Sequence, residues 1–267
     1  KTAQNAIQAV YDDISGEMTR TLSGLMETET AWLVAALNKG IGIELITLGL
    51  TQEQIMSAAS DALILNAPSS EWWSRQSAKL LNNFKDTIRQ GWLRGETNAQ
   101  LLRRLTKSTD EEGNPIFDLR MGTRRGAEAV IRTSVQQIAN DAHMLVYKEN
   151  SDVVKGVMWV ATLDQRTTPL CASLDGLTWD LEGNPIGHGK TFEPPPRHWG
   201  CRSTTVPVLK SFRELGIDLD EIPESTRASM DGQVPAGMTF DEWLRQKEDE
   251  QPGFVAEMFG KGKARLW

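Results

Sequence analysis

Apolar residues in the first part of the chain recur every three or four positions, which is the spacing of one face of an α-helix. The first such stripe consists of Ile7, Val10, Ile14, Met18, Leu22 and Leu25. The helical pattern continues to Lys39 and Gly40, and glycine is a frequent residue just after a helix end. The sequence therefore predicts a long first helix that ends near Gly40.

Three later segments carry a capping box, in which a Thr is followed three residues later by Gln or Glu. The Thr hydroxyl accepts a backbone N–H at the helix start, and the second side chain binds back to the Thr N–H. The three pairs are Thr51 with Gln54, Thr97 with Gln100, and Thr239 with Glu242. Each pair predicts the start of a helix, and Ser70 is expected to cap a further helix that carries Trp72 and Trp73.

A polar segment at residues 108–120, STDEEGNPIFDLR, interrupts the helical pattern and is the best candidate for an internal boundary. A second long stripe follows it and predicts a helix over residues 123–148. Its apolar members are Ala127, Ile131, Val135, Ile138, Ala142 and Leu145. We therefore divide the chain into a helical region at 1–110, a second domain at 111–210 and a C-terminal extension at 211–267 that we expect to continue further.

Beyond residue 150 the pattern changes to β-branched and aromatic residues in partial alternation, which favours strands. Residues 153–164 predict one strand, and LTWDL and KTF predict two short ones around a turn-rich loop, GNPIGHG. STTVPVL predicts a last strand at a sheet edge, because Pro207 cannot donate to a neighbouring strand. The predicted fold class is α+β, with helices followed by short antiparallel strands.

Composition limits the classes of function. The chain has 267 residues and a formal net charge of -7, whereas a protein that coats DNA normally carries a basic surplus. Two cysteines are too few for a disulfide framework, so a reducing compartment is expected. No run of 18 apolar residues occurs, so we expect no membrane partner.

Candidate chemistry gathers around two cysteines and a proline-rich segment, EPPPRHWGCR at residues 193–202. Zinc prefers four tetrahedral ligands, mostly thiolate and imidazole. Cys171, His198 and Cys201 could supply three, and His188 a fourth if its loop folds over. Thr168 stands where a Cys-x-x-Cys motif would have its first cysteine, and a hydroxyl is a poor zinc ligand. We therefore expect no cofactor, with zinc as the alternative.

Two other interpretations of these residues remain open. The cysteines can be buried thiols that pack like small apolar side chains, or form a disulfide after exposure to oxygen. Alternatively, a Cys–His pair can act as a nucleophile, with Asp164 or Asp175 orienting His198, or the carboxylates of Asp164, Asp175 and Asp180 can hold a nuclease metal. We favour the structural interpretation and expect no catalytic residue.

A basic cluster at the start of the second long helix consists of Arg120, Arg124, Arg125 and Arg132. The simplest interpretation is a solvated face paired with nearby acids. The alternative is a contact to DNA or to an acidic partner surface.

The order of these motifs resembles the phage Mu protein F-like family of head morphogenesis proteins. The matching stretches are IRTSVQQIANDA, VMWVATLDQRTTPLCASLDG and FEPPPRHWGCRS, and the likeness extends over roughly residues 90–267. The family-motif residues, for which the resemblance implies a structural role, are Arg132, Thr133, Trp159, Asp164, Arg166, Asp175, Gly176, Pro195, Pro196 and Arg202. Many members have cysteines where this chain has Thr168 and Ser203, so half of any family zinc ligands are lost.

The resemblance implies a minor head protein of a tailed phage that is not an enzyme. Such a protein would lie in the capsid interior near the portal vertex, after a period in the host cytoplasm during assembly. Several copies would surround the portal, and packaged double-stranded DNA and the major capsid or scaffold protein are further expected partners. Its roles would be head morphogenesis and DNA packaging or ejection. A nuclease or peptidase that uses the His198 region and a DNA-binding module that uses the arginines are the alternatives.

The same motif leads to a geometric prediction. The prolines restrict the backbone and should deliver His198 and Cys201 against the strand around Trp159. Cys201 should then lie near Cys171, both buried, and Arg202 should bind a carboxylate, either Asp164 or Asp175.

Overall fold

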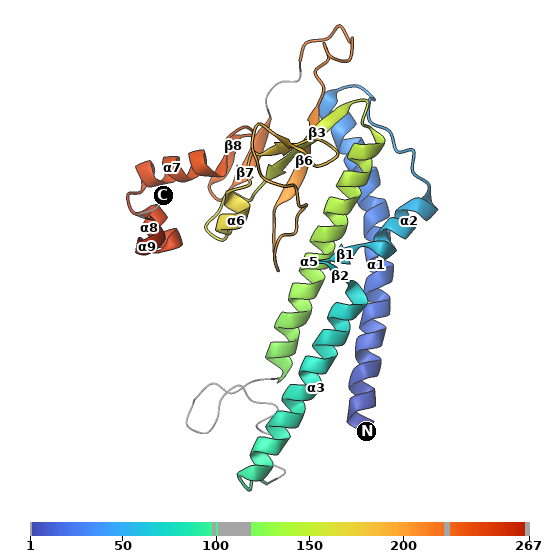
Figure 1. Ribbon diagram of the computed structural model, residues 1–267, viewed down its shortest axis with the longest axis vertical. Helices are drawn as coiled ribbons and strands as arrows, with labels where there is room; N and C mark the ends of the chain where they lie inside the picture. The colour runs from blue at the N-terminus through green and yellow to red at the C-terminus, as the bar shows by residue number, and fades with distance from the viewer. Residues whose placement is uncertain (1, 98–99, 101–118, 222–224, 265–267) are drawn as a thin grey trace. The chain divides into compact units, whose positions relative to one another are not determined.

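A computed structural model describes residues 2–97, 100, 119–221 and 225–264 (Figure 1). The long helices lie in the first part of the chain, with a short helix and a two-stranded hairpin between them, and further short antiparallel strands and short helices follow, which confirms the α+β class. The longest helices are α1 (Thr2–Ile41), α3 (Ser69–Leu93) and α5 (Leu119–Glu149). Among the described helices, none combines the length and the apolar character needed to cross a membrane.

The chain forms two compact units, and each contains segments that are distant in sequence. The first unit comprises residues 1–27, 51–139 and 198–200, and the second comprises 28–50, 140–197 and 201–267. The predicted boundary between residues 110 and 111 lies outside the described residues and stays a prediction. Residues 210 and 211, on either side of the other predicted boundary, both belong to the second unit.

The first unit is built from helices around buried aromatic and aliphatic side chains. It includes α2 (Gln52–Asp61) and a two-stranded hairpin of β1 (Leu63–Ile64) and β2 (Ala67–Pro68). Trp73 of α3 is 1% exposed, and its ring centroid lies 6.3 Å from that of Tyr11 in α1. The hydroxyl of Ser77 donates to Gln8 Oε1 over 3.0 Å, so α1 and α3 pack through apolar and polar contacts together.

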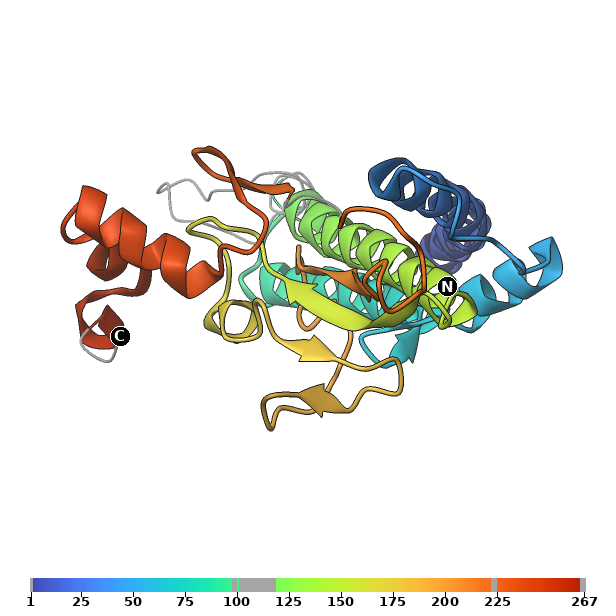
Figure 2. The same cartoon turned by 90° about the horizontal axis from the view of Figure 1, so that it is seen from above.

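The second unit contains a four-stranded antiparallel sheet in the order β5-β4-β3-β6 (Figure 2). The strands are β3 (Val154–Val160), β4 (Thr178–Trp179), β5 (Pro185–Ile186) and β6 (Thr204–Leu209). The sheet packs on the C-terminal turns of α5, where the Tyr147 hydroxyl donates to the Thr205 carbonyl over 3.2 Å. Burial raises the pKa of Tyr147 well above its ordinary range. Trp159 and Trp179 lie in the core of this unit.

Two asparagines hold the segment after α1 against the second unit's core. Asn38 accepts the N–H groups of Leu45 and Ile46 and donates to the Ile46 carbonyl. Asn150, which is 2% exposed, exchanges two hydrogen bonds of 2.8 Å with the backbone of Thr47. These amide side chains replace the partners that an irregular backbone lacks.

The C-terminal part of the chain has a core of its own within the second unit. A hairpin of β7 (Thr226–Ser229) and β8 (Gly232–Pro235) leads to α7 (Phe240–Glu250), α8 (Phe254–Phe259) and α9 (Lys261–Ala264). Phe240, Trp243 and Phe254 stack there in sequence and pack with Leu163. Residues 225–264 are therefore folded together with the sheet-bearing part of the unit.

Most of the predicted elements are confirmed. The capping boxes at Thr51 and Thr239 both form, and Pro207 lies in the edge strand β6. Thr97 and Gln100 exchange the expected hydrogen bonds, although the residues that follow lie outside the described part.

Three predictions are wrong in detail. Ser70 does not cap α3, because that helix begins at Ser69 and Ser70 lies inside it. The first helix continues to Ile41, and Gly42, rather than Gly40, adopts the left-handed conformation with φ of 85°. KTF is not a strand; β5 lies instead inside the predicted loop. Asp180 accepts the N–H groups of Glu182 and Asn184, which closes the turn early and allows Pro185 to pair with Trp179.

Candidate functional site

The two cysteines lie side by side in the second unit. Cys171 belongs to the short helix α6 (Pro169–Ala172), and Cys201 precedes β6. Their Sγ atoms are 3.7 Å apart, and the residues are 2% and 3% exposed. We call these residues the thiol pair. The prediction that Cys201 lies near Cys171, with both buried, is confirmed.

The environment of the thiol pair is unfavourable for a thiolate nucleophile. The hydrogen bond with Cys201, followed by burial, raises the pKa of the Cys171 thiol far above its ordinary value. A nucleophilic cysteine needs a lowered thiol pKa, which a neighbouring cation or the N-terminus of a helix normally causes. Cys171 therefore stays protonated near neutral pH, and the geometry gives no support to the Cys–His catalytic interpretation.

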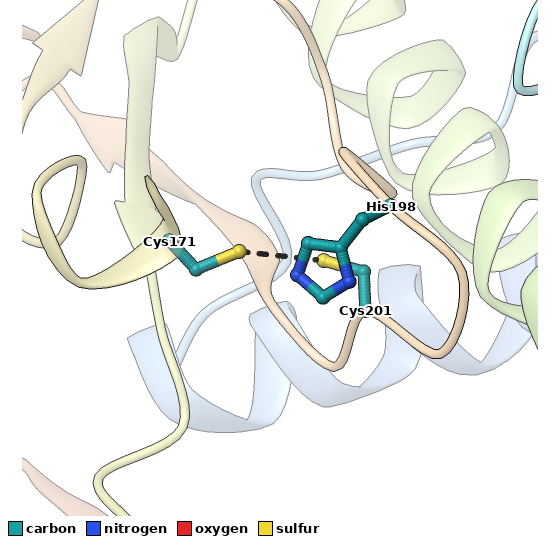
Figure 3. Close-up of side chains that lie close together, drawn as sticks. All are labelled: Cys171, His198 and Cys201. Carbon is teal, nitrogen blue, oxygen red and sulfur yellow. Dashed lines mark hydrogen bonds between the residues drawn. The ribbon is translucent and has the colours of Figure 1, made fainter. Parts of the chain in front are cut away.

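His198 comes from the same loop as Cys201 and points toward the thiol pair (Figure 3). One ligand atom from each of Cys171, His198 and Cys201 lies within 4.8 Å of the other two. The predicted fourth ligand, His188, is wrong. Its Nε2 lies 2.8 Å from the Thr178 carbonyl, its Nδ1 accepts the Lys190 N–H, and its ring packs edge-on against Trp179.

Asp164 and Arg202 form a paired contact near the surface. Arg202 Nη2 donates to Asp164 Oδ1 over 2.7 Å, and its Nη1 donates to Oδ2. The hydrogen bond from Arg202 holds the pKa of Asp164 below its ordinary value. Arg166 adds its backbone N–H, while its side chain is 77% exposed. Of the two predicted partners of Arg202, the structure thus selects Asp164.

Asp175 occupies a buried polar site. Its Oδ1 accepts the Ala161 N–H over 2.6 Å, and its Oδ2 accepts the Phe240 N–H at the start of α7 over 2.7 Å. Arg227 of β7 binds both oxygens and also donates to the carbonyls of Ala161 and Met238. The Asp175 side chain is 1% exposed and that of Arg227 is 11% exposed. This cluster joins β3, β7 and α7.

Sequence reasoning missed Arg227. It follows the family motif by many residues and stands in a segment that predicted no strand. The Asp231-Gly232 dipeptide was an available signal, because such pairs favour tight hairpins, and Ser229 does pair with Gly232. A hairpin prediction would have placed Arg227 on a strand, although not beside Asp175.

The three aspartates proposed as nuclease ligands do not meet. Asp164 and Asp175 each bind an arginine, and Asp180 binds the backbone and side chain of Asn184. Among the residues that the structure describes, no carboxylate cluster suited to a divalent metal is found. The hydrogen bonds to Asn184 also lower the pKa of Asp180. These carboxylates stabilise local structure.

Glycine and proline positions of the motif have clear local roles. Gly176 has φ of 76° and donates its N–H to the carbonyl of Trp159, which itself is fully buried. A Cβ at Gly176 would lie 3.0 Å from Thr239 Cγ2, so both conformation and space favour glycine. Pro195 and Pro196 are buried and joined by a cis peptide bond.

The tip of the proline-rich loop belongs to the first unit. The Gly200 N–H donates to the buried Thr133 hydroxyl of α5 over 3.1 Å. Trp199 packs edge-on against Trp72, with ring centroids 4.7 Å apart. Thr133 therefore binds loop backbone, which is a structural role.

The arginine cluster is described only in part. Arg125 and Arg132 are exposed on α5. The side chains of Arg120 and Arg124 lie outside the described residues. A contact to DNA or to an acidic partner therefore stays a prediction.

Comparison with known protein families gives a match. The family model of Phage Mu protein F like protein matches residues 82–206. No curated protein and no solved structure matches the chain significantly. The matched stretch contains the thiol pair, Asp164, Asp175 and the proline-rich loop, whereas Arg227 and α7 lie beyond it. Residues 82–206, a little under half of the chain, are therefore similar to the phage Mu protein F-like family, which supports the resemblance that the motif order indicates.

Proposed function

We propose that this protein is a minor head protein of a tailed phage, which acts in head morphogenesis and in DNA packaging or delivery. The observation that carries the proposal is the family match over residues 82–206. The paired motif residues support it, because Asp164, Asp175 and Thr133 bind arginine or backbone partners rather than surrounding a reaction centre.

The proposed place is the capsid interior near the portal vertex, with several copies around the portal ring. The helical first unit is the proposed contact region, because apolar side chains remain exposed there. Val10 and Ile14 of α1 are 55% and 38% exposed, and Ile131 and Val135 of α5 are 42% and 40% exposed. Apolar side chains that gather on a helix surface are typical of protein interfaces.

A net charge of -7 is compatible with a location beside packaged DNA. A strongly basic protein would bind the phosphates tightly, whereas an acidic one can share the capsid without coating the DNA. During assembly the protein would pass through the host cytoplasm, and buried cysteines are compatible with that reducing compartment.

Copurification tests the proposed partner. Portal complexes would be isolated from infected cells through a tag on the portal protein, and this protein would be quantified in the particle and non-particle fractions. We expect it to follow the portal at a fixed ratio of more than one copy per ring. Recovery in the non-particle fraction alone would contradict the proposal.

A cleavage assay tests the enzymatic alternative. Purified protein would be incubated with plasmid DNA and Mg²⁺ beside a His198→Ala variant. We expect both to show the same background cutting, because the carboxylates that a nuclease metal needs are bound to Arg202, Arg227 and Asn184. Cutting by the wild type that the variant lacks would support an enzyme.

A further inference from the structure

Three metal-binding side chains converge on one point between α6 and the loop that precedes β6. Cys171 and Cys201 contribute sulfur, His198 contributes an imidazole, and one ligand atom of each lies within 4.8 Å of the others. The two thiols and the imidazole form the donor set that zinc prefers over magnesium or calcium. We propose that these three residues bind one zinc ion.

The sulfur separation suits tetrahedral zinc. Zinc–sulfur bonds of about 2.3 Å at the tetrahedral angle place two sulfurs about 3.8 Å apart. The Sγ atoms of Cys171 and Cys201 are 3.7 Å apart, whereas a disulfide needs about 2.0 Å. The thiol pair can therefore accept zinc without a change in the sulfur–sulfur distance. On binding, the two thiols release their protons to solvent and become thiolates.

The imidazole is prepared for coordination by its backbone contact. His198 Nδ1 lies 3.1 Å from the Trp199 carbonyl, which can only accept a hydrogen bond. A neutral imidazole that donates to this carbonyl carries its proton on Nδ1, so Nε2 is the nitrogen whose lone pair would bind the metal. A carbonyl that orients a ligating histidine through its other nitrogen is a common feature of zinc sites.

Two hydroxyl groups contact the thiol pair. Thr168 and Ser203 both hydrogen-bond the side chain of Cys171, and Ser203 is 2% exposed. Three protein ligands plus water is a known coordination set for zinc. A water molecule would complete the proposed set, because the structure brings only three protein ligands together among the residues it describes.

Local charges do not oppose the ion. Arg202, the cation next to Cys201 in sequence, is bound to Asp164 through both terminal nitrogens. Lys190 donates its Nζ to the Ser173 carbonyl over 2.6 Å. Two thiolates also neutralise the charge of Zn²⁺, so the bound ion adds no net charge to a buried position.

Metal analysis of the full chain tests the proposal directly. The protein would be purified in reducing, chelator-free buffer and its zinc measured; the metal-free protein would then be titrated with Co²⁺. We expect about one zinc per chain and strong visible and thiolate charge-transfer absorption with Co²⁺, as tetrahedral thiolate sites give. Zinc should also protect both thiols from alkylation and raise the Tm. Wild-type protein that holds no zinc above the buffer blank and gives no such absorption would overturn the proposal.

Variants separate the proposed site from adventitious binding. Cys171→Ser and Cys201→Ser should abolish the charge-transfer absorption, and His198→Gln should weaken Co²⁺ binding by at least about tenfold. His188→Gln is the matched control, because His188 binds Thr178 and should leave binding unchanged. Equal metal binding by the double cysteine variant, or equal losses in both histidine variants, would contradict the assignment. Circular dichroism of the metal-free variants shows whether they fold. The zinc content and Co²⁺ absorption of the wild type test the proposal even if a variant does not fold.

Discussion

Asp164 and Asp175 are both family-motif aspartates and each binds an arginine, but their surroundings differ. The Asp164 and Arg202 side chains are 18% and 34% exposed, so water screens their charges. The Asp175 and Arg227 side chains are 1% and 11% exposed, and two backbone N–H groups complete the shell of the buried carboxylate. One contact closes a local loop near the surface, and the other joins three elements inside the unit.

This difference shows what the motif aspartates contribute. A buried charge without its partner costs several kcal/mol, whereas the loss of an exposed pair costs little. Asp175 also lies at the N-terminus of α7, where a helix favours negative charge. We infer that Asp175, together with the apolar contacts of Leu163, holds residues 225–264 against the rest of the second unit, and that Asp164 stabilises the loop around Arg202.

Replacement of Asp175 should have the largest effect on stability. Asp175→Ala leaves Arg227 buried without its carboxylate and removes the acceptor of the Ala161 and Phe240 N–H groups. We expect the free energy of unfolding to fall by about 3–5 kcal/mol. Urea denaturation followed by tryptophan fluorescence measures this change.

The control for this measurement is Asp218→Asn, which changes an exposed aspartate of the same unit. It should alter the free energy of unfolding by less than about 0.5 kcal/mol. A loss below about 1 kcal/mol in Asp175→Ala would remove the contrast between the two aspartates.

A buried polar contact without charge should have a smaller effect. Asn150→Ala leaves the Thr47 N–H and carbonyl without their side-chain partner. We expect a loss of about 1–3 kcal/mol, because unsatisfied groups are neutral here. Hydrogen exchange should also accelerate at Thr47. If Asn150→Ala lowers the free energy of unfolding as much as Asp175→Ala does, burial of the polar group, and not its charge, determines the size of the effect.

The cap of α7 tests the helix that Asp175 contacts. Thr239→Ala removes the hydroxyl that accepts the Glu242 N–H. The expected cost is about 1 kcal/mol, measured by thermal or urea unfolding. Thr239→Ser keeps the hydroxyl and should have a free energy of unfolding close to that of the wild type. If Thr239→Ser is as destabilised as Thr239→Ala, packing of the methyl group is responsible.

Disruption of the exposed pair should have the smallest effect, and that effect should depend on pH. Arg202→Gln should cost at most about 1 kcal/mol near neutral pH. Because Arg202 lowers the pKa of Asp164, the pair stabilises the folded protein above the ordinary carboxyl pKa of about 4 and loses this contribution as the pH falls through the lowered value.

The measurement compares the free energy of unfolding of the wild type and Arg202→Gln at several pH values, so that the contributions of the other carboxylates cancel in the difference. The difference in the free energy of unfolding should shrink on acidification. A difference that grows as the pH falls would contradict the assignment of Asp164 as the partner.

The helices and the sheet edge could be predicted because their signals are local. Capping boxes at Thr51 and Thr239 and the proline in β6 act within a few residues, and all three are confirmed. The predicted strand KTF is wrong because the composition of GNPIGHG assigns residues 185 and 186 to the turn, whereas they form β5. The Asp180 side chain closes the turn before residue 185, because it accepts the N–H groups of Glu182 and Asn184.

The candidate site was predicted in part for the same reason. The thiol pair and the contact of Arg202 with a carboxylate follow from a motif whose members are close in sequence. The choice between Asp164 and Asp175 stayed open, because Arg227, which binds Asp175, is far along the chain. Pairings between distant segments depend on tertiary packing, which no local pattern specifies.

The proposed place beside the portal can be tested by locating the protein in an intact phage particle. An asymmetric reconstruction of the phage head, combined with mass spectrometry of purified particles, would locate the chain and count its copies. We predict density for the helices of the first unit beside the portal ring, inside the shell, in several copies. Complete particles that lack the protein, or density confined to the outer surface, would contradict its proposed role as a minor head protein near the portal.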